Sequence, residues 1–169
     1  INLNNHYKDK TMNILTEQIN LNSLDLDCKS TIEIVNLFSE EDKEPQRAVK
    51  KAIPQLVKAI DEITLKLKSD GRLFYIGSGT SGRLGVLDAS ECPPTFCSDP
   101  EMVQGIIAGG APSLIKSSES LEDIIELAII NLQDKNFSKD DVLIGITASG
   151  RTPYVASALN YAKRLNALT

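Results

Sequence analysis

Apolar positions recur at helical spacing over one long segment of the chain. Between residues 45 and 69 they return every three or four residues, with Pro45 at the start and Ser69-Asp70-Gly71 at the end, as helix termini prefer. A shorter apolar stripe follows the capping-box sequence Ser30-Thr31-Ile32-Glu33. The pattern predicts a helix over 45–69 and a short helix from Thr31.

Short apolar segments alternate with helical ones in the rest of the chain. We expect strands at 72–76, 103–108 and 141–147, and helices at 81–91, 114–132 and 153–165. This alternation predicts an α/β fold with a parallel sheet, right-handed crossovers and a ligand site beyond the carboxyl ends of the strands.

Composition places the chain among ordinary folded proteins. Its 169 residues, 41% of them hydrophobic, with a formal net charge of -5, fit one domain or part of one. We expect residues 1–11 to be an added or upstream extension, 12–44 an N-terminal arm with a short helix, and 45–169 the α/β domain. Since the sequence shows neither a membrane-length apolar run nor a signal peptide, we expect a cytoplasmic protein with no membrane partner.

The rare residue types exclude several kinds of chemistry. His6 is the single histidine, so the chain cannot form a Ser-His-Asp triad, a Cys-His pair or a histidine-containing zinc site. Cys28, Cys92 and Cys97 lack C-x-x-C spacing and are expected to be reduced thiols, Cys92 as a packed one. The acidic balance and the absence of Trp argue against nucleic-acid binding.

Two hydroxyl-rich glycine loops follow the first and third predicted strands, at 77–83 and 148–152. Glycines let backbone amides approach an anion, hydroxyls add donors, and the following helix N-terminus supplies positive potential. The alternative is that these residues only end strands and cap helices. Two such loops at matching positions favour a phosphate site, and we expect its residues to be Ser78, Gly79, Thr80, Ser81, Ser149, Gly150, Arg151 and Thr152. Arg83 or Arg151 would add a bidentate clamp, or instead form a surface salt bridge.

A nucleotide site is the competing interpretation of the first loop, because Gly77, Gly79 and Gly82 satisfy G-x-G-x-x-G. The second predicted strand, however, ends in Ala108-Gly109-Gly110 and lacks the acidic residue that holds a ribose. The Walker A pattern of nucleotide-binding loops is not satisfied either, because Arg83 follows Gly82 at the position where that pattern requires Lys. A monophosphate therefore fits better than a nucleotide.

Several longer motifs occur in order along the chain: Gly79-Thr80-Ser81-Gly82-Arg83-Leu84-Gly85, Leu87-Asp88-Ala89-Ser90-Glu91-Cys92-Pro93-Pro94-Thr95-Phe96, Ile107-Ala108-Gly109-Gly110 and Ala148-Ser149-Gly150-Arg151-Thr152-Pro153-Tyr154-Val155. Together they resemble the N-acetylmuramic acid 6-phosphate etherases. The resemblance implies a sugar isomerase (SIS) domain, a three-layer α/β sandwich with a parallel sheet preceded by N-terminal helices. Family members continue well past residue 169, so the domain is expected to be incomplete at its C-terminus.

The resemblance also implies a chemistry. Etherases cleave the D-lactyl ether of N-acetylmuramic acid 6-phosphate to N-acetylglucosamine 6-phosphate and D-lactate during cell-wall recycling, without a metal or redox cofactor. It implies Glu91 as the proton donor, Glu122 as the base, a sugar-phosphate substrate and a homodimer. A non-catalytic sugar-phosphate-binding regulatory module, similar to glucokinase regulatory proteins, remains the alternative.

The residues themselves support the two acids unequally. Glu91 precedes Cys92-Pro93-Pro94, so we expect it to end its helix beside the negative pole, or to be a surface acid there. Glu122 is expected inside the 114–132 helix, where neighbouring acids also suit a solvated face. Asp123 is the reserve candidate for the base.

Overall fold

The computed structural model describes residues 15–116 and 119–169, and the expected extension at 1–11 lies outside them. The chain divides into two compact units, one reaching to Ala59 and one spanning Ile60–Thr169. Helix α3, Lys43–Leu67, crosses the boundary between them. Each unit is described by itself.

The first unit consists of short helical turns followed by two helices. Three 3-10 turns, Leu15–Glu17, Leu21–Ser23 and Leu26–Cys28, precede helix α2, Thr31–Glu41. The predicted capping box is confirmed, since the backbone N–H of Ser30 donates to Glu33 Oε2 at 2.8 Å. The predicted long helix is confirmed as well, with bounds two residues earlier than expected.

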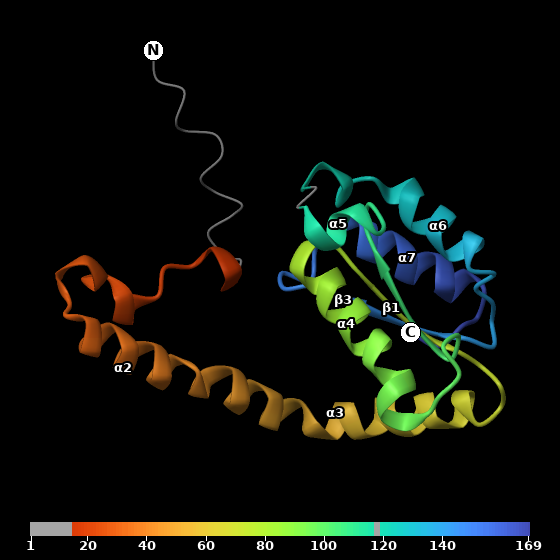
Figure 1. Ribbon diagram of the computed structural model, residues 1–169, viewed down its shortest axis with the longest axis horizontal. Helices are drawn as coiled ribbons and strands as arrows, with labels where there is room; N and C mark the ends of the chain where they lie inside the picture. Colours follow the sequence, from red (N-terminus) through yellow and green to blue (C-terminus); the bar gives the residue numbers. More distant parts are fainter. Residues whose placement is uncertain (1–14, 117–118) are drawn as a thin grey trace, which may run out of the picture. The chain divides into compact units, whose positions relative to one another are not determined.

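A parallel sheet forms the centre of the second unit. Its strands are β1 (Leu73–Gly77), β2 (Val103–Ile107) and β3 (Val142–Ile146), in the order β2-β1-β3, which confirms the three predicted strands. The helices are α4 (Gly79–Phe96), α5 (Pro112–Ile115), α6 (Ile125–Asp134) and α7 (Pro153–Arg164). Figure 1 shows α4 on one face of the sheet and α6 with α7 on the other, so the predicted three-layer α/β arrangement is confirmed.

The hydrophobic core lies between the sheet and the α6–α7 layer. Alternate residues of β1, Phe74 and Ile76, are fully buried there, because successive side chains of a strand point to opposite faces. The opposite face receives α4 at unusually short range. A Cβ atom on Gly82 would lie only 2.7 Å from the carbonyl oxygen of Gly77, so glycine is what allows α4 to rest on β1.

A charged cluster joins the amino ends of β1 and β3. Arg72 donates from Nε to Asp141 Oδ1 at 2.9 Å and from Nη2 to Oδ2 at 2.8 Å. The Asp141 carboxylate, which is 3% exposed, also accepts from the backbone N–H groups of Arg72 and Ser138. The Ser138 hydroxyl adds a fifth donor at 3.2 Å, so this buried carboxylate is fully hydrogen-bonded, as a buried charge requires.

Two predicted helix boundaries are wrong. Helix α4 does not end at Glu91 but continues to Phe96, with Pro93 and Pro94 in its last turn. Packing on β1 and β2 holds this backbone helical despite the local preference of a residue before proline. The predicted 114–132 helix is divided into α5, a 3-10 turn at Glu119–Leu121 and α6.

Candidate sugar-phosphate site at the carboxyl ends of the strands

The pairing of β1 with β3 brings the two hydroxyl loops together. Gly77 lies opposite Ile146 in the parallel register, so Ser78 and Thr147 leave neighbouring strands at the same level. Adjacent strands are about 5 Å apart, which makes the loops direct neighbours. Helices α4 and α7 begin immediately after them and direct their N-termini to this edge.

The first loop passes directly from β1 into α4. Ser78 has extended backbone angles and precedes the helix, and Gly79 has a φ of 52°. Nothing lies within 4 Å of a Cβ built on Gly79, so its requirement for glycine comes from the backbone conformation. Thr80 is exposed and Ser81 is half-buried. This loop therefore presents hydroxyls and helix N–H groups without any bulky side chain between them.

The second loop is organised by its own hydroxyls. Thr147 Oγ1 and Thr152 Oγ1 are 2.9 Å apart, and the backbone N–H of Arg151 donates to Ser149 Oγ at 3.2 Å. Gly150, with a φ of 71°, makes the turn between them. The loop is thus shaped before any ligand binds, and the Arg151 side chain remains exposed.

Glu122 contacts the first loop and the beginning of helix α7. Its Oε2 accepts a hydrogen bond from Ser78 Oγ at 3.5 Å, and its backbone carbonyl accepts from the N–H of Tyr154, in the first turn of α7, at 3.0 Å. Glu122 is therefore not inside a helix as predicted, but in the turn that precedes α6. The bond to α7 removes its carbonyl from any helical ladder. The neighbouring acids in the sequence suggested a solvated helix face for Glu122, whereas the structure places it at the carboxyl ends of the strands.

Tyr154 was not singled out from the sequence, although it anchors this turn. Its side chain is fully buried, and its hydroxyl accepts a hydrogen bond from Asn131 Nδ2 at 2.7 Å, which joins α7 to α6. Burial raises the pKa of Tyr154, so the phenol stays neutral. The sequence feature that could have identified Tyr154 as buried is its position on the apolar face of α7, four residues before the buried Ala158.

Glu91 lies far from the loops of its own chain. It is exposed and stands twelve residues after Gly79 on α4. At 1.5 Å of rise per residue, this separation is about 18 Å along the helix axis. The structure therefore does not bring the two predicted acids, Glu91 and Glu122, together within one chain.

Two other predicted residues are engaged in local contacts. Arg83 Nε donates to the carbonyl oxygen of Leu114 at 3.1 Å, which ties α4 to α5. Cys92 Sγ lies 3.4 Å from the Asp88 carbonyl oxygen, one helical turn earlier. Burial and the nearby Asp88 carboxylate raise the pKa of the Cys92 thiol, which fits the packed thiol expected from the sequence.

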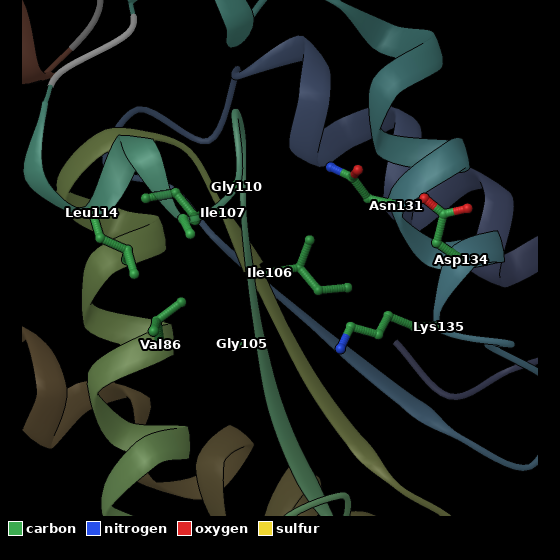
Figure 2. A pocket seen from close by; sticks show the side chains of 10 residues that line it. Val86, Gly105, Ile106, Ile107, Gly110, Leu114, Asn131, Asp134 and Lys135 are labelled. Atoms are coloured by element: carbon green, nitrogen blue, oxygen red, sulfur yellow. The ribbon is translucent and has the colours of Figure 1, made fainter.

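A cavity of about 330 Å³ lies elsewhere, across the outer edge of β2 (Figure 2). Its walls are mostly apolar, from Val86 and Leu114 on one side to Asn131 and Asp134 of α6 on the other. The hydroxyl loops do not line it. Within the described ranges, no three His, Cys, Asp or Glu side chains are grouped to hold a metal ion. The same residues include no helix with the length and apolarity of a bilayer span.

Comparison with known proteins defines the class of this fold and site. A family model described as the glucokinase regulatory protein N-terminal SIS domain matches residues 55–163, which include β1, both hydroxyl loops and most of α7. The chain belongs to this family of SIS domains, as the etherase resemblance predicted.

The curated relatives are more specific. A protein named N-acetylmuramic acid 6-phosphate etherase from Prochlorococcus marinus (strain NATL1A) is 72% identical over 98% of this chain and 54% of its own length. Proteins of the same name from strain MIT 9303 and from Parasynechococcus marenigrum (strain WH8102) are 58% and 55% identical, over 98% and 92% of this chain and 52% and 49% of their own lengths. The chain spans about half the length of the curated relatives it matches.

Proposed function

We propose that the protein containing this chain is a carbon–oxygen lyase that cleaves the D-lactyl ether of N-acetylmuramic acid 6-phosphate. The observation that carries the proposal is the contact between Ser78 and Glu122 at the carboxyl ends of the strands. It joins a carboxylate to the loop that suits a phosphate, in a chain whose relatives bear the etherase name.

The substrate phosphate would bind between the two loops. Ser78, Thr80 and Ser81 supply hydroxyls from the first loop, and Ser149 and Thr152 supply them from the second. The N-termini of α4 and α7 add N–H donors and positive potential, which favour a doubly charged anion. Gly79 and Gly150 leave space for its oxygens.

Glu122 is suited to the role of base. In the ring-opened sugar, the carbon beside the aldehyde carries an acidic proton, which an ionised carboxylate removes. The electron pair then expels the lactyl oxygen from the adjacent carbon while Glu91 of a second subunit donates a proton to that oxygen. Glu91 of the same chain is about 18 Å along α4 from the first loop and would not reach it. Water adds across the resulting double bond, so that the overall reaction consumes one water and yields N-acetylglucosamine 6-phosphate and D-lactate.

The cell location and assembly are part of the same proposal. The three cysteines are free in the described structure, which suits a reducing compartment such as the cytoplasm. The reaction would belong to cell-wall amino sugar recycling, and the protein would act as a homodimer without nucleic acid or membrane as partner.

D-lactate release from N-acetylmuramic acid 6-phosphate tests the proposal. We expect release by the full-length protein that contains this chain and its loss in the Glu122→Gln variant, with sugar-phosphate binding retained. The Asp123→Asn variant serves as the matched control and is expected to keep its activity. A folded protein that binds the sugar phosphate and releases no lactate would contradict the proposal.

The second candidate is a sugar-phosphate-binding regulatory module. It is favoured by the family model, whose description is that of a glucokinase regulatory protein domain. Such a module needs the hydroxyl loops but has no use for a proton donor at Glu91. If the full-length protein binds the sugar phosphate without releasing D-lactate, and Glu91→Gln leaves that binding unchanged, the regulatory module is the better account.

A further inference from the structure

The outer edge of strand β2 has no neighbouring strand among the described residues. The sheet order is β2-β1-β3, so β2 pairs with β1 on one side and ends the sheet on the other. A strand at the edge of a sheet presents a row of unpaired backbone N–H and C=O groups, which is a template for pairing with a further strand. The surface beside these groups decides what can pair there.

Alternate residues of β2 direct their backbone groups towards this outer edge. The N–H of Ala108, directly after β2, donates to the carbonyl oxygen of Gly77 at 3.0 Å, so Ala108 faces β1. Because the backbone groups of successive residues in a strand point to opposite edges, every second residue before Ala108 faces β1 too. The residues between them face outwards, and these are Val103, Gly105 and Ile107.

The outward N–H groups have no acceptor within the described ranges. The N–H of Gly110 donates to the carbonyl oxygen of Ile107 at 2.9 Å, which closes the turn after β2. No described residue accepts from the N–H groups of Val103, Gly105 and Ile107. Ile107 is 4% exposed, and an unpaired N–H on so buried a residue costs free energy unless water or a binding partner reaches it.

The cavity of about 330 Å³ lies along these same groups. Gly105 and Ile107 line it, and Figure 2 shows β2 between two flanking walls. Val86 of α4 and Leu114 of α5 form one wall, and side chains of α6 form the other. The cavity is therefore a groove that has the outer edge of β2 at its base.

The two walls differ in chemistry. The wall formed by α4 and α5 is apolar, whereas Asn131 and Asp134 of α6, with Lys135 directly after them, make the other wall polar. The charges of Asp134 and Lys135 are opposite, so this wall suits uncharged polar side chains. An extended segment on the β2 edge turns successive side chains to opposite faces. Its side chains would therefore meet the apolar wall and the polar wall in alternation.

The flanking helices exclude a second copy of this sheet from the edge. Paired strands lie about 5 Å apart. In each copy β2 is recessed between α4 with α5 on one side and α6 on the other, so helices of two copies would collide before their β2 strands came that close. A single extended segment without flanking helices fits the groove instead.

We propose that the outer edge of β2 binds an extended segment of a partner protein, in which apolar and uncharged polar residues alternate, as an additional strand of the sheet. Hydrogen bonds to the backbone of Val103, Gly105 and Ile107 supply affinity, and the two unlike walls select the alternation. The proposal does not depend on the etherase function, because the hydroxyl loops do not line this groove.

Binding of a synthetic peptide to the full-length protein that contains this chain tests the proposal. The probe is Lys-Thr-Val-Thr-Val-Thr-Lys, whose five central residues match the five residues of β2. Fluorescence anisotropy of the labelled peptide measures its dissociation constant. The peptide Lys-Thr-Thr-Thr-Val-Val-Lys has the same composition without the alternation, and we expect it to bind about tenfold more weakly or less.

Two neighbouring substitutions give a matched pair. Leu114→Asp places a carboxylate against the apolar side chains of the peptide and should weaken binding by about tenfold or more. Ile115→Asp, at a position that is 92% exposed and outside the groove, should leave binding unchanged. Equal weakening by the two substitutions would overturn the proposal, as would failure of the wild-type protein to bind the alternating peptide.

Amide hydrogen exchange, resolved by residue, tests the edge itself and needs no variant. In the free full-length protein, the N–H groups of Val103, Gly105 and Ile107 should exchange faster than those of Gln104 and Ile106, which face β1. The peptide should slow the outward set by about tenfold and change the inward set little. Slowing confined to other residues would overturn the proposal. So would slow exchange of the outward set in the free protein, because another part of the same protein would then already cover the edge.

Discussion

The two ends of the parallel sheet differ in how their polar groups are satisfied. At the amino ends of the strands, Arg72 and Asp141 form a closed cluster in which five donors satisfy one buried carboxylate. At the carboxyl ends, Glu122 is exposed and touches Ser78 at the limit of hydrogen-bond distance. The closed end stabilises the fold, while the open end keeps polar groups available for a ligand.

The largest expected effect is at the open end. Glu122→Gln in the full-length protein should lower kcat for D-lactate release by about 10²–10⁴-fold, because a general base of this kind contributes that factor. The urea midpoint of the variant should match the wild type, since the exposed carboxylate has little to stabilise. A kcat within about threefold of wild type would remove Glu122 from the chemistry.

The next largest effect is at the closed end. Asp141→Asn removes the charge that faces Arg72 and should lower the free energy of unfolding by about 2–3 kcal/mol, less than a fully buried pair because Arg72 reaches water. Urea unfolding measures this loss of free energy, and circular dichroism is used to follow it because the chain has no Trp for fluorescence. Asp140→Asn, at the exposed neighbouring position, is the matched control and should be neutral.

A smaller effect on stability is expected from the second loop. Gly150→Ala should lower the free energy of unfolding by about 1 kcal/mol, because alanine is strained at a φ of 71°. Gly150→Asn should cost less, since asparagine tolerates this conformation and nothing lies within 4 Å of the added Cβ. Equal losses in the two variants would show that the backbone conformation is not the cause.

The smallest effect is a difference in acid sensitivity. Burial by itself raises the pKa of Asp141, but hydrogen bonds from Arg72 and Ser138 outweigh it and hold this pKa below its ordinary value. A lowered folded-state pKa contributes stability above the unfolded value, near pH 4, which is lost as the pH falls through the folded value. The urea midpoint should therefore fall more steeply below about pH 4 in the wild type than in Asp141→Asn.

Other carboxylates do not obscure this comparison. Hydrogen bonds from Lys29, Ser30 and Asn22 lower the pKa values of Asp25, Glu33 and Glu41, respectively, all in the first unit. These groups are the same in both proteins, so their contributions cancel in the difference. Parallel pH profiles for the two proteins would mean that Asp141 carries no such linkage.

The sequence by itself determined the local elements and the kind of site. Helical periodicity predicted α3, and apolar segments ending in glycine loops predicted β1, β2 and β3. These features depend on neighbouring residues alone, because backbone preference and amphipathic spacing act within a few positions. For the same reason Ser30 and Glu33 predicted the start of α2.

Only the tertiary structure decided which residues meet. The turn at Glu122 exists because the N–H of Tyr154, thirty-two positions later, binds its carbonyl. Packing on the sheet carried α4 past Glu91 to Phe96 and so separated the two acids. Arg72 contacts Asp141 because β1 lies between β2 and β3 in the sheet and pairs with both, which places the residue before β1 beside the residue before β3. Contacts between distant residues leave no periodic pattern in the sequence, so they emerge only when the strands and helices pack together.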